Sequence, residues 1–412
     1  MNRSKGGVAG LGHLRTSQKE QIHVIYIVRA LAILGVILVH VSSLPIGEII
    51  DKQSFMYQFF NFINVFNRFG TTTFIFLSAF VLFYSYYDRK MDKKLIATFY
   101  KRRLLYILVP YLICSIYYYT IQMYYSYGED WNQFFQNVSL ADFWSALVMG
   151  KAFYHLYFIF ISIQFYLLFP FFLWLLQRIK LLAKHLIWIG LVLQWIFVLL
   201  DYFYWNYADK SFLATSYMSN YLLGAFFGIH YHAIKGWIEV TWKKLLSRQA
   251  FYWIPLWIVW AGASLSHVYL WYRTRAYDVF AHGLVYEGLW FLHSYTSGLI
   301  LLQLSAGLYR LLSPFWTTVL YRLGMASFGI YIIHAGILFY YSLLPASYNP
   351  KLYYAYVAGG FAVTLGASWG VVALAQKYMK HSWVLFGALP KGKPVIPGRT
   401  APVHGHSRTE AG

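Results

Sequence analysis

The chain has 412 residues, of which 59% are hydrophobic, 22% aromatic and only 12% charged. An ordinary soluble domain carries roughly 25% charged residues, so this composition excludes a soluble enzyme, and the many aromatic residues exclude a disordered or fibrous chain. The net charge of +20 is spread over short gaps between long apolar runs, which is typical of a polytopic membrane protein and not of a nucleic-acid-binding face.

Apolar stretches follow one another along the chain, and about ten of them are long enough to cross about 30 Å of hydrocarbon as helices. The gaps between several of them are short, which predicts antiparallel neighbours joined by tight turns. We therefore expect an all-α fold, a polytopic transmembrane helical bundle. The predicted spans are 24–44, 65–86, 103–125, 153–177, 185–203, 215–232, 251–270, 285–309, 323–343 and 352–375.

Basic residues are distributed unevenly between the two sides that an even number of spans creates. Of the Lys and Arg residues outside the spans, 26 fall on the side of the two termini and six on the other side. The positive-inside rule then predicts that both termini are cytoplasmic. The expected parts are a cytoplasmic segment 1–23, a transmembrane domain 24–376, and a cytoplasmic, disordered tail 377–412 rich in Pro and Gly.

Ionisable side chains inside predicted spans are candidates for function, because a charge near the bilayer centre costs at least about 2.5–3.5 kcal/mol. Arg29 and His40 lie eleven residues apart in the first span. That spacing puts them on the same face of one helix, about 16 Å apart along its axis. The other such residues are Glu287, His293 and His334.

This pair suits the transfer of an acyl group through the thickness of the membrane. A permanently charged guanidinium at Arg29 can bind the phosphates of a cytoplasmic coenzyme A donor, and the near-neutral imidazole of His40 can remove a proton from an acceptor hydroxyl. The alternative is that the two side chains extend to the headgroups of opposite leaflets.

Several segments, in order, resemble the membrane-bound acyltransferase 3 family, which modifies cell-surface and extracellular sugars. VRALAILGVILVH, residues 28–40, resembles its first-helix signature, and TTTFIFLSAFVLFY is similar to its aromatic run ending in Ser-Gly-Phe. YKRRLLYILVPYL, YHLYFIFISIQFYLLFP and LGMASFGIYIIH resemble its third-helix, fourth-helix and late-helix patterns. Ala79 stands where the family usually has Gly, and Tyr106 where many relatives add a basic residue. Both fit a subgroup similar to polysaccharide intercellular adhesin-type proteins, proposed to modify or export surface polysaccharide.

The resemblance implies that His40 is the catalytic base and that Arg29 is essential near the donor. Arg102 and Arg103 open the third span, where an entrance for acyl-CoA needs positive charge, although basic residues also anchor cytoplasmic helix ends. Glu287 is the candidate partner of His40; the alternatives are a structural pair with Arg68 or a place nearer the interface.

Other polar residues are expected to line the pocket. Ser327, Tyr331 and His334 are spaced i, i+4 and i+7, so they share one helix face, where they form either part of the site or hydrogen bonds between helices. Ser78 and His155 belong to segments that carry the resemblance. No tight metal-ligand spacing occurs, and we predict no metal site.

These observations predict a membrane O-acyltransferase that moves an acetyl or similar short acyl group from acyl-CoA to a hydroxyl of a surface glycan. Its expected partners are the lipid bilayer, acyl-CoA and the glycan, with no nucleic acid, in the plasma membrane of a bacterium. The alternative is a transporter that exports a polysaccharide. Oligomeric state is not predicted.

Overall fold

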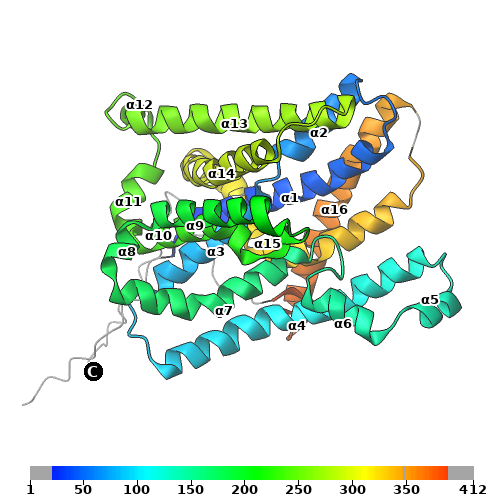
Figure 1. The fold of residues 1–412 in the computed structure, drawn as a ribbon, viewed down its shortest axis with the longest axis horizontal. Coiled ribbons are helices and arrows are strands. Elements are labelled where there is room, and N and C mark those ends of the chain that lie inside the picture. Colours follow the sequence, from blue (N-terminus) through cyan, green and yellow to red (C-terminus); the bar gives the residue numbers. More distant parts are fainter. Residues whose placement is uncertain (1–20, 347–348, 388–412) are drawn as a thin grey trace, which may run out of the picture.

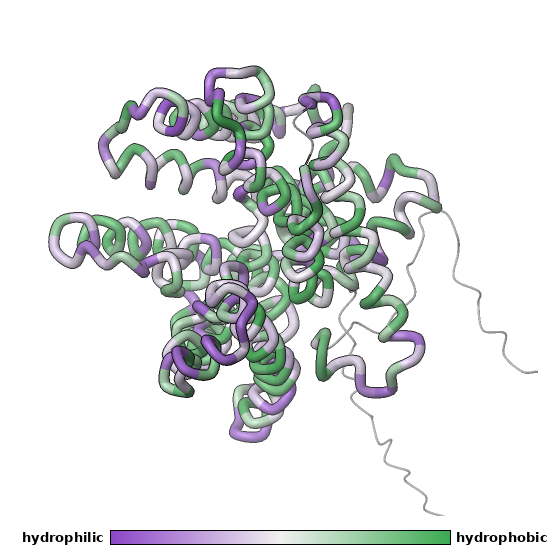
Figure 2. Tube along the Cα trace, turned by 90° about the vertical axis from the view of Figure 1, so that its right-hand side faces the viewer, coloured by the Kyte–Doolittle hydropathy of each residue, from purple (hydrophilic) through white to green (hydrophobic). Residues whose placement is uncertain are grey.

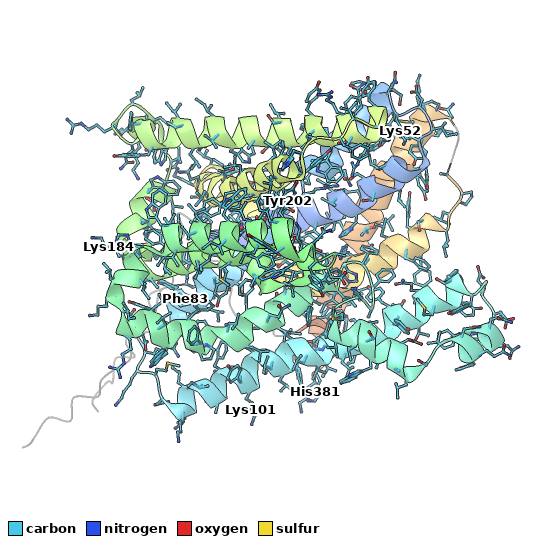
Figure 3. All side chains as sticks on the ribbon, in the orientation of Figure 1. Lys52, Phe83, Lys101, Lys184, Tyr202 and His381 are labelled. Atoms are coloured by element: carbon cyan, nitrogen blue, oxygen red, sulfur yellow. The ribbon has the colours of Figure 1, made fainter. Side chains whose placement is uncertain are left out.

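The computed structural model of the protein describes residues 21–346 and 349–387. Within these ranges the chain forms helices and turns and no β-strand, which confirms the predicted all-α fold. Long helices, rich in hydrophobic residues, run across the molecule beside one another (Figures 1 and 2). Lys52 and Lys184 lie towards opposite ends of the bundle in Figure 3, so the two loops that the sequence assigns to opposite sides are far apart.

Eight helical segments in the described ranges are long and apolar enough to cross a membrane, judged by length and composition. Each coincides with a predicted span, and the chain is therefore a multi-pass membrane protein. The segments are α1 (Val24–Glu48), α2 (Phe55–Phe66) with α3 (Gly70–Tyr86), α4 (Lys93–Ser126), α7 (Tyr157–Arg178), α9 (Leu186–Leu200) with the π-helix η1 (Asp201–Trp205), α13 (Ala250–Tyr277), α15 (Pro314–Ser342) and α16 (Pro350–Tyr378).

Two predicted spans are not among these eight segments. The range 285–309 falls in α14 (Gly283–Leu311), which has 29 residues and buries several Ser and Thr side chains along with His293. The range 215–232 contains α10 (Met218–Ile229), whose 12 residues cover about 18 Å and do not span the hydrocarbon alone. Two 3₁₀ turns precede α10, η2 (Lys210–Phe212) and η3 (Ala214–Tyr217).

Six shorter helices complete the described chain. The first two of them along the sequence lie at the projecting end of α4 in Figure 1. The six helices are α5 (Trp131–Asn137), α6 (Leu140–Val148), α8 (Lys180–Lys184), α11 (Tyr231–Ile238), α12 (Trp242–Leu245) and α17 (Trp383–Phe386).

Part of the predicted tail 377–412 lies within the residues that the structure describes. Residues 377–387 are described and ordered, because α17 packs against α4 and α15 and buries Phe386. Gly387 sits beside this contact with φ of 68°, a conformation that glycine adopts without strain. Residues 1–20 and 388–412 of the predicted cytoplasmic segments lie outside the described residues.

Glycines allow the central helices to approach closely. A Cβ atom on Gly224 of α10 would lie 2.1 Å from the Phe76 carbonyl oxygen of α3, and one on Gly228 would lie 2.5 Å from the Phe80 carbonyl oxygen. The pair forms a G-x-x-x-G pattern, which brings helix backbones together in membranes. The methyl group of Ala79 faces Gly224: a Cβ atom on Gly224 would lie 3.0 Å from it.

The contact between α1 and α15 is closer still and positions the candidate site. A Cβ atom on Gly324 would lie 1.7 Å from the Tyr26 carbonyl oxygen of α1. Arg29 follows Tyr26 by three residues on α1, and Ser327 follows Gly324 by three residues on α15. The close approach therefore brings together two residues that are about 300 positions apart in the sequence.

We expect Gly324→Ala to lower the free energy of unfolding by at least about 1–3 kcal/mol, because the added methyl group forces two helix backbones apart. Thermal unfolding in detergent measures the effect. Gly366→Ala is the matched control, since a Cβ atom there meets nothing within 4 Å. Equal melting temperatures for the two variants would show that the α1–α15 contact is not tight.

Candidate active site

Arg29 lies in a cavity between α1, α3, α4, α7 and α15, which we call the Arg29 cavity. Its empty space, part of it open to solvent, is about 750 Å³. Its Nε–H donates a hydrogen bond to Ser327 Oγ at 3.0 Å. Arg103 from α4 and Ser78 from α3 line the same cavity, and Ser78 Oγ donates to the hydroxyl of Tyr166 at 3.3 Å. Two guanidinium groups therefore face a single cavity that is otherwise walled mainly by aliphatic and aromatic side chains.

His40 lies three turns further along α1 and lines a second cavity, the His40 cavity, whose empty space, part of it open to solvent, is about 720 Å³. The walls come from α1, the α2–α3 junction, α7, η3, α14 and α15. Thr71 and Tyr157 face it and share a hydrogen bond between their hydroxyls at 3.1 Å. Among the described residues, Arg68 is the one permanently charged side chain that lines this cavity.

The imidazole of His334 adjoins that of His40, and the imidazole of His155 adjoins that of His334. The His334 ring centroid is 5.3 Å from that of His40 and 5.3 Å from that of His155. His334 Nδ1 lies 2.7 Å from the Tyr331 carbonyl oxygen, and His155 Nε2 lies 3.2 Å from the Ile332 carbonyl oxygen. A carbonyl oxygen only accepts, so each of these nitrogens carries the proton, and the neutral ring leaves His334 Nε2 as an unprotonated nitrogen.

Tyr331 lies at the wall that the two cavities share. Its side chain lines both the Arg29 cavity and the His40 cavity, and its hydroxyl donates to the His155 carbonyl oxygen. The predicted shared face of Ser327, Tyr331 and His334 is thus turned into the bundle, with all three side chains buried. One end of this face meets Arg29 and the other end meets His40.

Comparison with known proteins assigns the chain to a family. A family model described as an acyltransferase domain, that of the acyltransferase 3 family, matches residues 22–373. The chain belongs to this acyltransferase family. No curated protein and no solved structure matches the chain.

The matched region of the acyltransferase contains the helices that carry Arg29, His40, Arg103 and the Tyr331 face. Both cavities therefore lie within the acyltransferase domain. Arg102 is placed differently from Arg103: its side chain is exposed and lines neither cavity, as expected of a residue that anchors a helix end.

The predicted pairing of Glu287 with His40 is wrong. Glu287 Oε1 lies 2.6 Å from Lys210 Nζ, and Lys210 also lies 3.2 Å from Asp201. Burial alone would lower the pKa of Lys210, but its hydrogen-bonded pairs with both carboxylates outweigh burial and raise it above the ordinary value. Glu287 does not line the His40 cavity of the acyltransferase, and its ion pair is with Lys210 and not with Arg68, the structural partner that the sequence offered as an alternative.

Arg68 is the residue of the site that sequence reasoning missed. It donates to Asn64 Oδ1 at 3.2 Å and lies 4.6 Å from the ring centroid of Trp271. The sequence placed Arg68 at the edge of a span. Asn64, a polar residue in an apolar run four residues earlier, was the readable sign of a polar partner for Arg68, and its side chain is buried. Arg275 also binds Asn64 Oδ1, at 3.2 Å.

His293 does not face either cavity of the acyltransferase but takes part in a buried chain of hydrogen bonds. Trp271 Nε1–H donates to His267 Nε2 at 3.0 Å, so a neutral His267 carries its proton on Nδ1 and donates to His293 Nδ1 at 3.1 Å. Across the described part of the chain, no group of three His, Cys, Asp or Glu side chains is arranged to hold a metal ion.

Proposed function

We propose that the protein is an O-acyltransferase that moves an acetyl or similar short acyl group from acyl-CoA at the cytoplasmic face to a hydroxyl of a glycan beyond the opposite face. The observation that carries the proposal is that the side chain of Tyr331 lines both the Arg29 cavity and the His40 cavity. Arg29 and Arg103 line the cavity on one side of Tyr331, and His40, the candidate base, lines the cavity on the other.

Arg29 and Arg103 bind the phosphate-bearing donor. Guanidinium groups match phosphate oxygens in charge and geometry, and the mainly apolar walls of the Arg29 cavity suit the uncharged arm that carries the thioester. The acyl group then reaches the His40 cavity beside Tyr331. Ahead of α9, where each predicted span coincides with a helix, the side of the N-terminus carries 14 Lys and Arg residues and the other side carries two, Lys52 and Lys151. This excess supports a cytoplasmic origin for the donor.

His40 acts as the general base. It removes the proton of the acceptor hydroxyl, the oxygen attacks the thioester carbonyl carbon, and the carbon–sulfur bond breaks as the thiol leaves with the proton from His40. Arg68, which lines the same cavity, stabilises the negative charge on the carbonyl oxygen during the attack. His334 takes the positioning role that the sequence assigned to Glu287, because it lies beside the His40 ring with its tautomer fixed by a backbone carbonyl.

Reconstituted protein, given acyl-CoA with a labelled acyl group and a panel of sugars, tests the proposal. Label covalently attached to the sugar is the expected result. Movement of sugar across the membrane without attached label would contradict the proposal and favour an exporter.

The two neighbouring arginines of α4 give a matched comparison. We expect Arg103→Ala to raise the KM for acyl-CoA by about 10-fold, the value of one hydrogen bond to a charged group. Arg102→Ala should leave it within twofold, because Arg102 is exposed and lines neither cavity. Initial rates at varied acyl-CoA concentration measure both constants, and equal KM values for the two variants would remove Arg103 from the donor site.

A further inference from the structure

A third cavity adjoins the site on the side away from Arg29. Its empty space, part of it open to solvent, is about 770 Å³, and it shares Arg68, Tyr217 and Trp290 with the His40 cavity. Its other walls come from α9, the η2–η3 segment, α13 and α14, and we call it the Glu287 cavity after the carboxylate that lines it. A ligand bound there would touch the residues that border His40 without passing through the Arg29 cavity.

The polar lining of this cavity is partly open to solvent. The Glu287 and Lys210 side chains are 24% and 30% exposed, although they form an ion pair at 2.6 Å. Lys210 keeps a second carboxylate partner, the buried Asp201, so it remains paired when Glu287 accepts a hydrogen bond from a ligand. The pair thus offers a carboxylate acceptor and an ammonium donor side by side, and adjacent hydroxyls of a sugar can bind both.

The apolar lining consists largely of aromatic rings. Trp290 follows Glu287 by three residues on α14, so the indole and the carboxylate lie on one face of the helix. Trp290 borders both cavities, and its ring meets Tyr217 edge-on at 5.8 Å between centroids. A broad indole face next to a charged hydrogen-bonding pair is a combination that fits a sugar ring, whose faces are apolar and whose edge carries hydroxyls.

We infer that the Glu287 cavity is the acceptor subsite, in which a sugar unit packs on Trp290 and hydrogen-bonds Glu287 and Lys210 while one of its hydroxyls reaches His40. This inference rests on the proposed function and adds to it the place and chemical class of the acceptor. The donor and acceptor then approach Tyr331 and Arg68 from opposite sides. Glu287 binds substrate and does not orient the base.

Steady-state kinetics of the reconstituted protein test the subsite, with labelled acyl-CoA and, as acceptors, the methyl glycosides of a neutral hexose and of an N-acetylhexosamine. We expect Trp290→Ala and Glu287→Gln each to raise the KM for the better glycoside by at least tenfold while the KM for acyl-CoA changes less than twofold. Trp290→Phe should recover part of the affinity, because it restores an aromatic face. Trp188→Ala and Glu129→Gln are the matched controls, since both side chains are exposed and line none of the three cavities.

Binding measured without turnover separates this inference from the proposed function. The glycoside should bind to the His40→Ala protein and lose at least tenfold in affinity when Trp290→Ala is added. Unchanged acceptor KM and affinity in both subsite variants, in a protein that does transfer label, would overturn the subsite alone. Failure of the wild-type protein to transfer label to any sugar would overturn the proposed function instead.

Discussion

Replacing His40 with Ala is expected to lower the rate of acyl transfer by about 100- to 10,000-fold, the usual contribution of a positioned general base. His40 is the imidazole that lines the cavity next to Tyr331, whereas His155 and His334 are fully buried and each bonded to a backbone carbonyl. The neighbouring imidazoles are therefore poorly placed to replace it. Transfer of label from acyl-CoA to a glycoside measures the loss.

His185→Ala is the matched control for this variant. His185 is exposed and lines none of the three cavities, so its removal should leave the rate within twofold of wild type. Elution as a single species from size-exclusion chromatography and an unchanged melting temperature would show that His40→Ala is folded. A folded His40→Ala protein with wild-type activity would remove the assigned base.

Replacing Arg29 with Ala is expected to have the second largest effect, a loss of about 10- to 100-fold in kcat/KM for acyl-CoA. The estimate follows from about 1.5–3 kcal/mol for a hydrogen bond to a charged group, with tenfold for every 1.4 kcal/mol. The substitution also leaves Ser327 Oγ without the donor that now lies 3.0 Å away. Titration of the variant with acyl-CoA separates weaker binding from slower chemistry.

Arg29→Lys distinguishes charge from geometry. Lysine keeps the positive charge but lacks the planar fork and the Nε–H that bonds Ser327. We expect the variant to keep part of the donor affinity and to remain below wild type. Full recovery in Arg29→Lys would mean that Arg29 contributes charge alone, and wild-type kinetics in Arg29→Ala would remove it from the donor site.

Much of the fold followed from patterns that are local in sequence. The length of each apolar run sets whether a helix can cross the hydrocarbon, so eight of the predicted spans coincide with helices that meet that requirement. The predicted span 215–232 is longer than α10, because the length of an apolar run does not distinguish a helix that crosses the membrane from a short helix buried against α3. Its G-x-x-x-G pattern, Gly224 and Gly228, was the readable sign of that close packing.

The site was predictable where it lies on one helix and was not where it depends on contacts between helices. Spacing put Arg29 and His40 on one face of α1, and Ser327, Tyr331 and His334 on one face of α15, and the structure turns both faces into the bundle. The partner of Glu287 could not be chosen in this way. Nothing in the sequence distinguishes Lys210, on a loop 77 residues earlier, from the other basic residues as a partner. Only the fold brings Lys210 to Glu287.

Transfer between separated compartments tests the central claim, that donor and acceptor meet at Tyr331 from opposite faces of the membrane. Vesicles with the protein in one known orientation are given labelled acyl-CoA on the face that bears the loop of Arg178 and Lys184, and glycoside on the other face alone. We expect label to appear on the glycoside, and to disappear when acyl-CoA is moved to the glycoside's side. Transfer that requires both substrates on the same face would contradict it.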